Sequence, residues 1–231
     1  LGLPRSPHGK ITRMACVSGR CIEGINMKQA VVTLICLLTL GLSHSALADG
    51  FSSALQQLAA KPVVRAQFQQ SKTIANSSKP MLSKGSLLFV KNQGVLWQLN
   101  SPVKADLVVT PRKMVQKTAH TQSVVNLKQT PYGPAATVLL QLMSGNEAAL
   151  RQHFQVTQFK QNGSSWSAGL QPKSASMKPL FSRVEINGGA YVNKIVLFDP
   201  QQRPTNIVFT GHSSANNSLN SSENALFKLA Q

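Results

Sequence analysis

The chain has 231 residues, and its 24 lysine and arginine residues against seven aspartate and glutamate residues give a formal charge of +17 at pH 7. All three cysteines lie within the first 48 residues, which excludes a disulfide scaffold for the rest of the chain. The lysines stand singly, whereas a nucleic-acid arm would concentrate them, so nucleic acid is not the expected partner.

An export signal is predicted near the start of the chain. Residues 27–29 form a positively charged segment, residues 30–42 an apolar run, and residues 46–48 an Ala-x-Ala cleavage site. The apolar run has about 13 residues, fewer than the roughly 20 that a spanning helix needs. We therefore expect an upstream extension outside the fold, a signal peptide cleaved after Ala48, and one exported domain, at residues 1–26, 27–48 and 49–231.

The positive charge of the exported domain leaves two interpretations open. Residues 49–231 hold 19 basic and six acidic side chains. Such a charge favours an anionic partner, and outside the cytoplasm we expect anionic lipid head groups or an acidic protein surface. Alternatively, the charged strand face simply keeps the domain in solution.

The exported domain is predicted to begin with a short helix and to continue as strands. Ser52 can cap a helix in which Phe51, Leu55 and Leu58 recur on one face, and Pro62 ends it. Apolar and polar residues then alternate, and Asn-Gly and other turn residues separate the alternating segments. We expect about ten antiparallel strands, at residues 64–74, 82–91, 95–99, 104–110, 113–118, 154–160, 165–170, 181–186, 191–198 and 204–210.

The strand pattern is interrupted once, after Asn126. Pro134 at the entry and Gly145 at the exit frame a short apolar helix around residues 138–143, with a further helical turn at 147–151. The Ser- and Asn-rich stretch 213–222 is expected to be mobile, and residues 225–229 to return as a last strand. The chain should therefore be one mostly β domain with two or three short helices.

Catalytic or metal-binding chemistry is not indicated. The three histidines of the domain are isolated, and none has metal-ligand spacing. Ser213 follows a glycine as in a nucleophile elbow, but it enters a polar loop, and no histidine follows to act as the base. We predict no catalytic residues, no metal and no cofactor. The acidic side chains considered for acid–base chemistry, none of which shows a pairing, are Asp106, Glu147, Glu185, Asp199 and Glu223.

Apolar side chains exceed what one sheet face needs if the other face meets water. They can form an ordinary core between sheet and helices, or they can enclose a ligand cavity. On the second interpretation, the predicted cavity lining is Phe68, Phe89, Val95, Trp97, Leu99, Val138, Leu139, Leu142 and Met143.

The order of several segments resembles the LolA family of periplasmic lipoprotein carriers. The chain has an amphipathic helix after the signal peptide, then Arg65-Ala66-Gln67-Phe68-Gln69-Gln70, and later the apolar helix after Pro134. The other matching segments are residues 84–91, 96–102, 170–173 and 195–209.

The resemblance implies an unclosed, strongly curved antiparallel sheet, a half-barrel, with a helical lid over a hydrophobic cavity. It implies a periplasmic monomer that carries the acyl chains of a lipoprotein from an inner-membrane exporter to an outer-membrane acceptor, with transient contact to the membrane surface. Lipoprotein-handling members of the family have an arginine and a proline at a position where residues 91–94 of this chain contain neither. Another lipid or a glycolipid is therefore an alternative cargo. A second hypothesis is an envelope binding or sensing module of the same fold that contacts anionic membrane or protein without transporting lipid.

Overall fold

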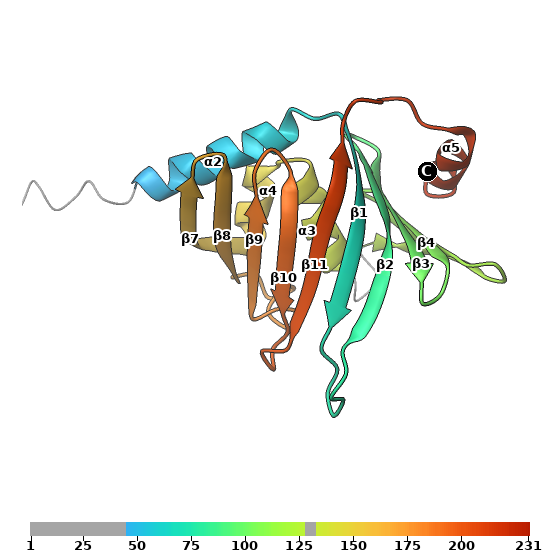
Figure 1. Cartoon of the computed structure of the whole chain (residues 1–231), viewed down its shortest axis with the longest axis horizontal. Helices are drawn as coiled ribbons and strands as arrows, with labels where there is room; N and C mark the ends of the chain where they lie inside the picture. The colour runs from blue at the N-terminus through green and yellow to red at the C-terminus, as the bar shows by residue number, and fades with distance from the viewer. Residues whose placement is uncertain (1–44, 128–132) are drawn as a thin grey trace, which may run out of the picture. The chain divides into compact units, whose positions relative to one another are not determined.

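The computed structural model describes residues 45–127 and 133–231 (Figure 1). The predicted upstream extension and most of the predicted signal peptide lie outside the described residues. Within these two stretches, none of the helices combines the length and the hydropathy needed to cross a bilayer.

Eleven strands form one antiparallel sheet in these stretches, in the order β6-β5-β4-β3-β2-β1-β11-β10-β9-β8-β7. Most strands that are adjacent in the sheet are also consecutive in the chain. The exception is the pairing of β1 with β11, which are far apart in the sequence. Strands β6 and β7 lie at the two edges, so the sheet is not closed, as predicted. The strands are β1 (Val63–Lys72), β2 (Met81–Val90), β3 (Gly94–Ser101), β4 (Ala105–Val109), β5 (Lys113–Lys117), β6 (Gln122–Asn126), β7 (Phe154–Asn162), β8 (Ser165–Pro172), β9 (Arg183–Gly188), β10 (Val192–Phe198) and β11 (Pro204–Ser213).

In the described stretches, four helices cover the sheet from two sides. They are α2 (Ser45–Ala59), α3 (Gly133–Met143), α4 (Glu147–His153) and α5 (Ser221–Lys228). Helix α2 runs across the upper ends of strands β7 to β10, α3 and α4 lie behind the sheet, and α5 lies apart from them near β3 and β4 (Figure 1). Residues of α2, α3 and α4 share an apolar cluster with one face of the sheet, which we call the inner face. Residues of α5 share a second cluster with the outer face.

The first helix starts earlier than predicted. It begins at Ser45, so Ser52 is not a cap but an interior residue, and its hydroxyl donates a hydrogen bond to Glu147 Oε1 over 2.8 Å. Alanine and leucine at positions 46–48 are strong helix formers and extend the helix backwards. The first turn thus includes residues that the predicted cleavage would remove. Cleavage after Ala48 stays a prediction.

Two further elements correct the sequence-based assignment. Strand β6 was not predicted, although it pairs with β5 over its whole length. The strand predicted at residues 225–229 is wrong, because this segment belongs to helix α5. Asn220 caps α5 by accepting a hydrogen bond from the Glu223 backbone amide, and the Glu223 carboxylate accepts one from the Asn220 amide. This reciprocal capping box fixes a helix where the residue pattern alone suggested a strand.

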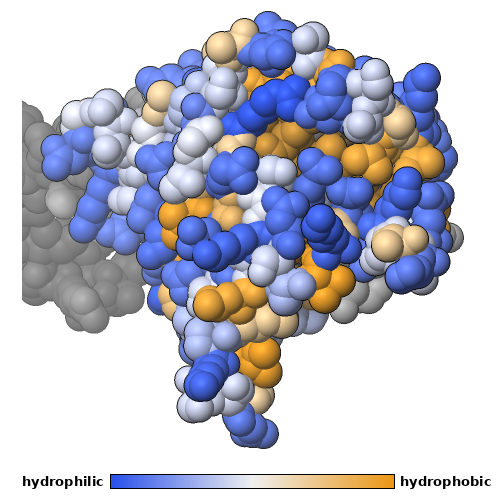
Figure 2. Space-filling model, turned by 45° about the vertical axis from the view of Figure 1, so that its right-hand side comes forward, coloured by the Kyte–Doolittle hydropathy of each residue, from blue (hydrophilic) through white to orange (hydrophobic). Residues whose placement is uncertain are grey.

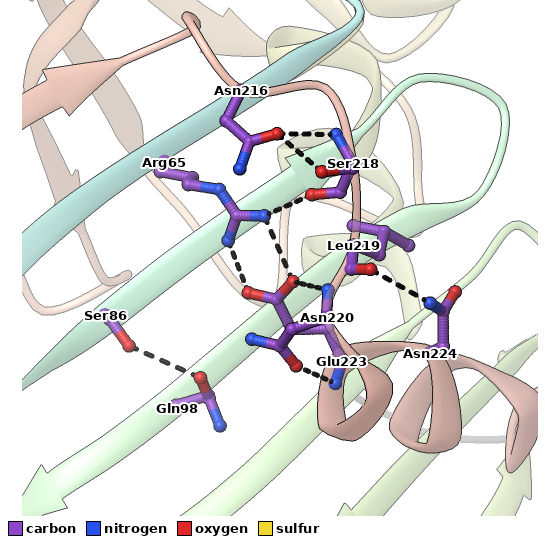
Figure 3. A network of polar contacts seen from close by, with 9 residues as sticks. All are labelled: Arg65, Ser86, Gln98, Asn216, Ser218, Leu219, Asn220, Glu223 and Asn224. Carbon is purple, nitrogen blue, oxygen red and sulfur yellow. Dashed lines mark hydrogen bonds and ion pairs between the residues drawn. The ribbon is translucent and has the colours of Figure 1, made fainter.

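An ion pair holds α5 against the outer face of the sheet (Figure 3). Arg65 of β1 donates hydrogen bonds to both carboxylate oxygens of Glu223, one of them over 3.0 Å, and to the carbonyl oxygen of Ser218 over 2.9 Å. The Glu223 side chain is 12% exposed and that of Arg65 30%. The hydrogen bond from Arg65 lowers the pKa of Glu223 from its ordinary value, against the opposing effect of burial. Leu226 and Phe227 pack below this pair in the outer cluster.

Removing the Glu223 charge should loosen α5 and destabilise the fold. We expect Glu223→Gln to lower the free energy of unfolding at neutral pH by about 1 to 3 kcal/mol, because the charged hydrogen bonds to Arg65 are weakened in a partly buried setting. Urea denaturation measures this difference. Glu185→Gln is the matched control, since Glu185 pairs with Arg183 in a half-exposed position, and an exposed pair contributes at most about 1 kcal/mol.

The same pair predicts a pH dependence. The pKa of Glu223 is lower in the folded protein than in the unfolded chain, so the pair stabilises fully above the unfolded pKa of about 4.3. This stabilisation is lost as the pH falls through the folded pKa. The stability difference between wild type and Glu223→Gln should therefore shrink between neutral pH and about pH 3. A difference that stays constant or widens over this range would contradict the assignment.

Candidate functional site

A cavity of about 460 Å³ lies between the inner face of the sheet and helix α3. Strand alternation brings every second side chain of a strand to this face. The lining comes from nine strands, from α3 and α4, and from the loop before β9. Of its 21 residues, 18 are apolar and none is charged. They are Gln70, Met81, Ser83, Trp97, Leu99, Leu107, Val109, Met114, Gln116, Ala136, Val138, Leu139, Leu142, Leu150, Leu170, Phe181, Val184, Ile186, Ile195, Leu197 and Ile207.

We place the mouth of the cavity at the strand ends opposite to helix α2, because the exposed lining residues Met81 and Gln116 lie there. Met81, which is 42% exposed, pairs with Lys72 beside the β1–β2 turn, and this turn projects at the end of the sheet away from α2 (Figure 1). The polar lining residues Gln70, Ser83 and Gln116 also lie near this end of their strands. At the other end, Phe51 of α2 packs edge-on against Phe159 of β7, with ring centroids 6.1 Å apart. The cavity is therefore apolar inside and polar at its rim.

Five of the nine residues predicted from the sequence line this cavity. They are Trp97, Leu99, Val138, Leu139 and Leu142. Their side chains come together from β3 and α3, which are far apart in the sequence. Whether they bind a ligand stays a prediction.

The other four predicted residues lie in the inner apolar cluster but not in the cavity lining. Phe68 is 1% exposed and lies against Trp97, with ring centroids 4.0 Å apart. Phe89 and Val95 pair with each other near the β2–β3 turn, where the helices cover them. Met143 lies at the end of α3, close to α2. These side chains support the lining from behind.

Sequence reasoning missed much of the lining, above all on strands β8 to β10. Leu170, Ile186 and Ile195 lie on alternating inward positions that the strand pattern does contain. The pattern gives the inward face, but it does not say which inward positions a helix covers. Phe181 and Met114 carried no signal that separates a lining residue from a core residue.

The acidic candidates of the sequence have structural partners instead of catalytic ones. Burial raises the pKa of Glu147, whereas hydrogen bonds from Ser52 and Arg151 lower it. The net effect is a lowered pKa. None of the five lines the cavity. Asp106, Glu147, Glu185, Asp199 and Glu223 contact Gln98, Arg151, Arg183, Arg203 and Arg65, respectively. In the part of the chain that the structure describes, no three His, Cys, Asp or Glu side chains gather as a metal site would require.

The family to which the chain belongs follows from this architecture and from its sequence. The fold defines a mostly β protein with an open antiparallel sheet and an apolar cavity on its inner face. The model of the family "Outer membrane lipoprotein carrier protein LolA" matches residues 62–228. The chain belongs to the LolA family.

Several solved structures are similar to this chain at low sequence identity. A LolA superfamily protein from Nitrosomonas europaea is 8% identical, with a TM-score of 0.40 over 74% of this chain and 94% of its own. A putative outer membrane lipoprotein-sorting protein domain from Vibrio parahaemolyticus is 8% identical, with a TM-score of 0.45 over 78% and 99%. The lipoprotein LppX from Mycobacterium tuberculosis is 9% identical, with a TM-score of 0.38 over 74% and 98%. A comparison with curated protein sequences finds no significant match. The assignment therefore rests on the family model.

Gly85 permits the close packing behind the cavity wall. It pairs with Phe68 on one side and Leu99 on the other. A Cβ at this position would lie 1.8 Å from the Gln98 carbonyl oxygen and 2.9 Å from a ring carbon of Phe68. No side chain fits there without displacing the backbone of β3 or the ring that supports Trp97.

Replacing Gly85 should therefore destabilise the cavity wall. We expect Gly85→Ala to lower the free energy of unfolding by about 1 to 3 kcal/mol, as overpacked cores do. Thermal or urea denaturation checks this value. Gly169→Ala in β8 is the matched control, because the nearest atom to its added Cβ is a side-chain oxygen of Thr157 at 3.2 Å. Equal stability of the two variants would show that β2 adapts to the methyl group.

Proposed function

We propose that the protein is a periplasmic carrier that shelters the acyl chains of a lipoprotein or another lipid in the cavity and moves them from the inner to the outer membrane. The observation that carries this proposal is the lining, which is large, almost wholly apolar and without a charged side chain. Each methylene kept from water contributes about 0.8 kcal/mol, so an acyl chain crossing an aqueous compartment needs such a shelter. The cavity volume lies within the range of about 300 to 1,000 Å³ found for ligand pockets.

Membership in a family of lipoprotein carriers supports the proposed location and partners. We place the mature chain in the periplasm as a monomer, with residues 1–26 outside the fold and residues 27–48 removed on export. An inner-membrane exporter would load the cargo, and an outer-membrane acceptor would receive it. Phe68, Phe89, Val95 and Met143 would support the bound acyl chain indirectly, while Trp97, Leu99, Val138, Leu139 and Leu142 would contact it.

The polar rim suggests how a cargo would lie in the cavity. Gln70, Ser83 and Gln116 offer neutral hydrogen-bonding groups close to the mouth. An acyl chain would extend inward along the sheet, with its polar end held at this rim. Where lipoprotein-handling members have their arginine, the β2–β3 turn of this chain has Lys91, whose ammonium group donates a hydrogen bond to the carbonyl of Ala59 at the end of α2 over 2.8 Å. Because this turn lacks the arginine, a glycolipid or another acyl lipid is an alternative cargo to a lipoprotein.

Filling the cavity should weaken cargo uptake. Leu107 of β4 is half-buried and lines the cavity, so Leu107→Trp would occupy space that an acyl chain needs. We expect the affinity for a fluorescent long-chain fatty acid to fall at least about tenfold, a change of 1.4 kcal/mol. Equilibrium fluorescence titration measures the affinity of each variant.

The matched control for this variant is Val208→Trp. Val208 lies on β11 and is 39% exposed, on the outer face beside the inward Ile207 and Phe209. This variant should bind the fatty acid like the wild type. If the wild-type protein takes up no acyl ligand, or if both tryptophan variants bind equally well, the cavity is not the carrier site.

A further inference from the structure

Large apolar side chains are exposed at the end of the sheet that holds the cavity mouth. Six such side chains are exposed in the described stretches, and four of them lie in or beside the β1–β2 and β3–β4 turns. Their exposed fractions are 42% for Ile74, 42% for Met81, 59% for Leu82 and 66% for Val103. The β1–β2 hairpin projects as a lobe from the molecule, and hydrophobic atoms reach its surface (Figure 2).

The strand register brings these side chains to one edge. Lys84 of β2 pairs with Ser101 of β3. Leu82 lies two residues beyond Lys84, and Val103 lies two residues beyond Ser101, both towards the same end of the sheet. Because side chains alternate between the faces of a strand, Met81 faces the cavity and Leu82 the outer surface. Met81 therefore links the apolar cavity lining, past the polar rim residues, to the exposed apolar side chains outside.

Lysines surround this apolar edge. Lys72 and Lys79 flank the β1–β2 turn, Lys84 lies beside Leu82, and Lys104 follows Val103, all of them exposed. Residues 72–84 and 99–105 contain no aspartate or glutamate. The nearest acidic residue along the chain, Asp106, accepts a hydrogen bond from the Gln98 side chain over 2.8 Å. We call this surface the mouth edge and define it by Ile74, Met81, Leu82, Val103, Lys72, Lys79, Lys84 and Lys104.

We propose that the mouth edge docks on an anionic lipid bilayer. The apolar side chains would enter the interfacial region while the lysines contact the anionic head groups, an arrangement that holds peripheral proteins on membranes. Lysine stems can lie along apolar surface with their charged ends in water, which suits a shallow insertion. A bilayer fits better than a protein partner because the edge projects outward, carries four exposed lysines with no carboxylate in residues 72–84 and 99–105, and needs no complementary pocket.

Docking in this orientation would turn the cavity mouth towards the lipid. Met81 belongs both to the cavity lining and to the mouth edge, so an acyl chain could pass between bilayer and cavity along this side chain. This consequence rests on the proposed carrier function, whereas the docking itself does not.

Vesicle co-sedimentation of the purified protein tests the docking. We expect binding to vesicles that contain phosphatidylglycerol, weaker binding at high salt, and little binding to pure phosphatidylcholine. The double variant Leu82→Ser/Val103→Ser should lose at least about tenfold in affinity because two apolar side chains no longer insert. The variant Lys79→Gln/Lys84→Gln should lose about fivefold for each lysine. The charge-matched control, Lys160→Gln/Lys228→Gln, changes exposed lysines on β7 and α5, away from the edge.

A tryptophan at the edge gives a second and independent readout. When anionic vesicles are added, the fluorescence emission of the introduced tryptophan, obtained by subtracting the wild-type spectrum, should shift to the blue in Leu82→Trp. It should not shift in Val208→Trp on the outer face. Equal vesicle binding by the edge and control variants, or the absence of a shift for Leu82→Trp, would overturn the proposal. Fatty-acid uptake by the edge variants in vesicle-free solution should be unchanged. Vesicle binding without any fatty-acid uptake by the wild type would contradict the carrier function alone.

Discussion

The structure depends on the need to cover both faces of one wide antiparallel sheet. Near the helical end of the sheet, strands carry apolar residues at consecutive positions, such as Val63 and Val64 or Leu87 and Leu88, so both faces are apolar there. Helices α2, α3 and α4 cover the inner face, and α5 covers the outer face with the help of the Arg65–Glu223 pair. Towards the β1–β2 turn the helices do not fill the space above the inner face. The cavity is what this incomplete cover leaves.

Much of the sheet could be predicted from the sequence, because alternation and turn chemistry are local signals. Most strands are confirmed, and the apolar helix between Pro134 and Gly145 also lies where its framing residues indicated. The sequence-based predictions were wrong where two local sequence signals favoured different structures. Residues 225–229 have the apolar content of a strand, but the Asn220–Glu223 capping box makes them helical. Ser52 looked like a cap, but the residues before it are good helix formers and continue the helix.

The apolar character of the cavity could be predicted from the sequence, but the full set of its lining residues could not. Inward positions follow from the two-residue period of a strand. Every strand residue that was predicted to line the cavity therefore lies in the inner apolar cluster or packs against it. Which of them meet empty space depends on where the helices stop, and this is a tertiary property. Phe68 illustrates the limit, because its neighbour in space is Trp97 of β3, which covers it from the cavity side. The apolar excess and the family resemblance both indicated a cavity, and five of the nine predicted residues line it.

The cavity, its rim and the mouth edge lie one after another, from an apolar interior to a basic surface. This arrangement matters for function only if the interior holds an apolar ligand. Native mass spectrometry of the protein isolated from the envelope of its own host, without detergent, tests this most directly. The account predicts adducts with the mass of an acylated lipid or lipoprotein that dissociate on unfolding. A protein that carries no adduct, even after incubation with total envelope lipid, would contradict it.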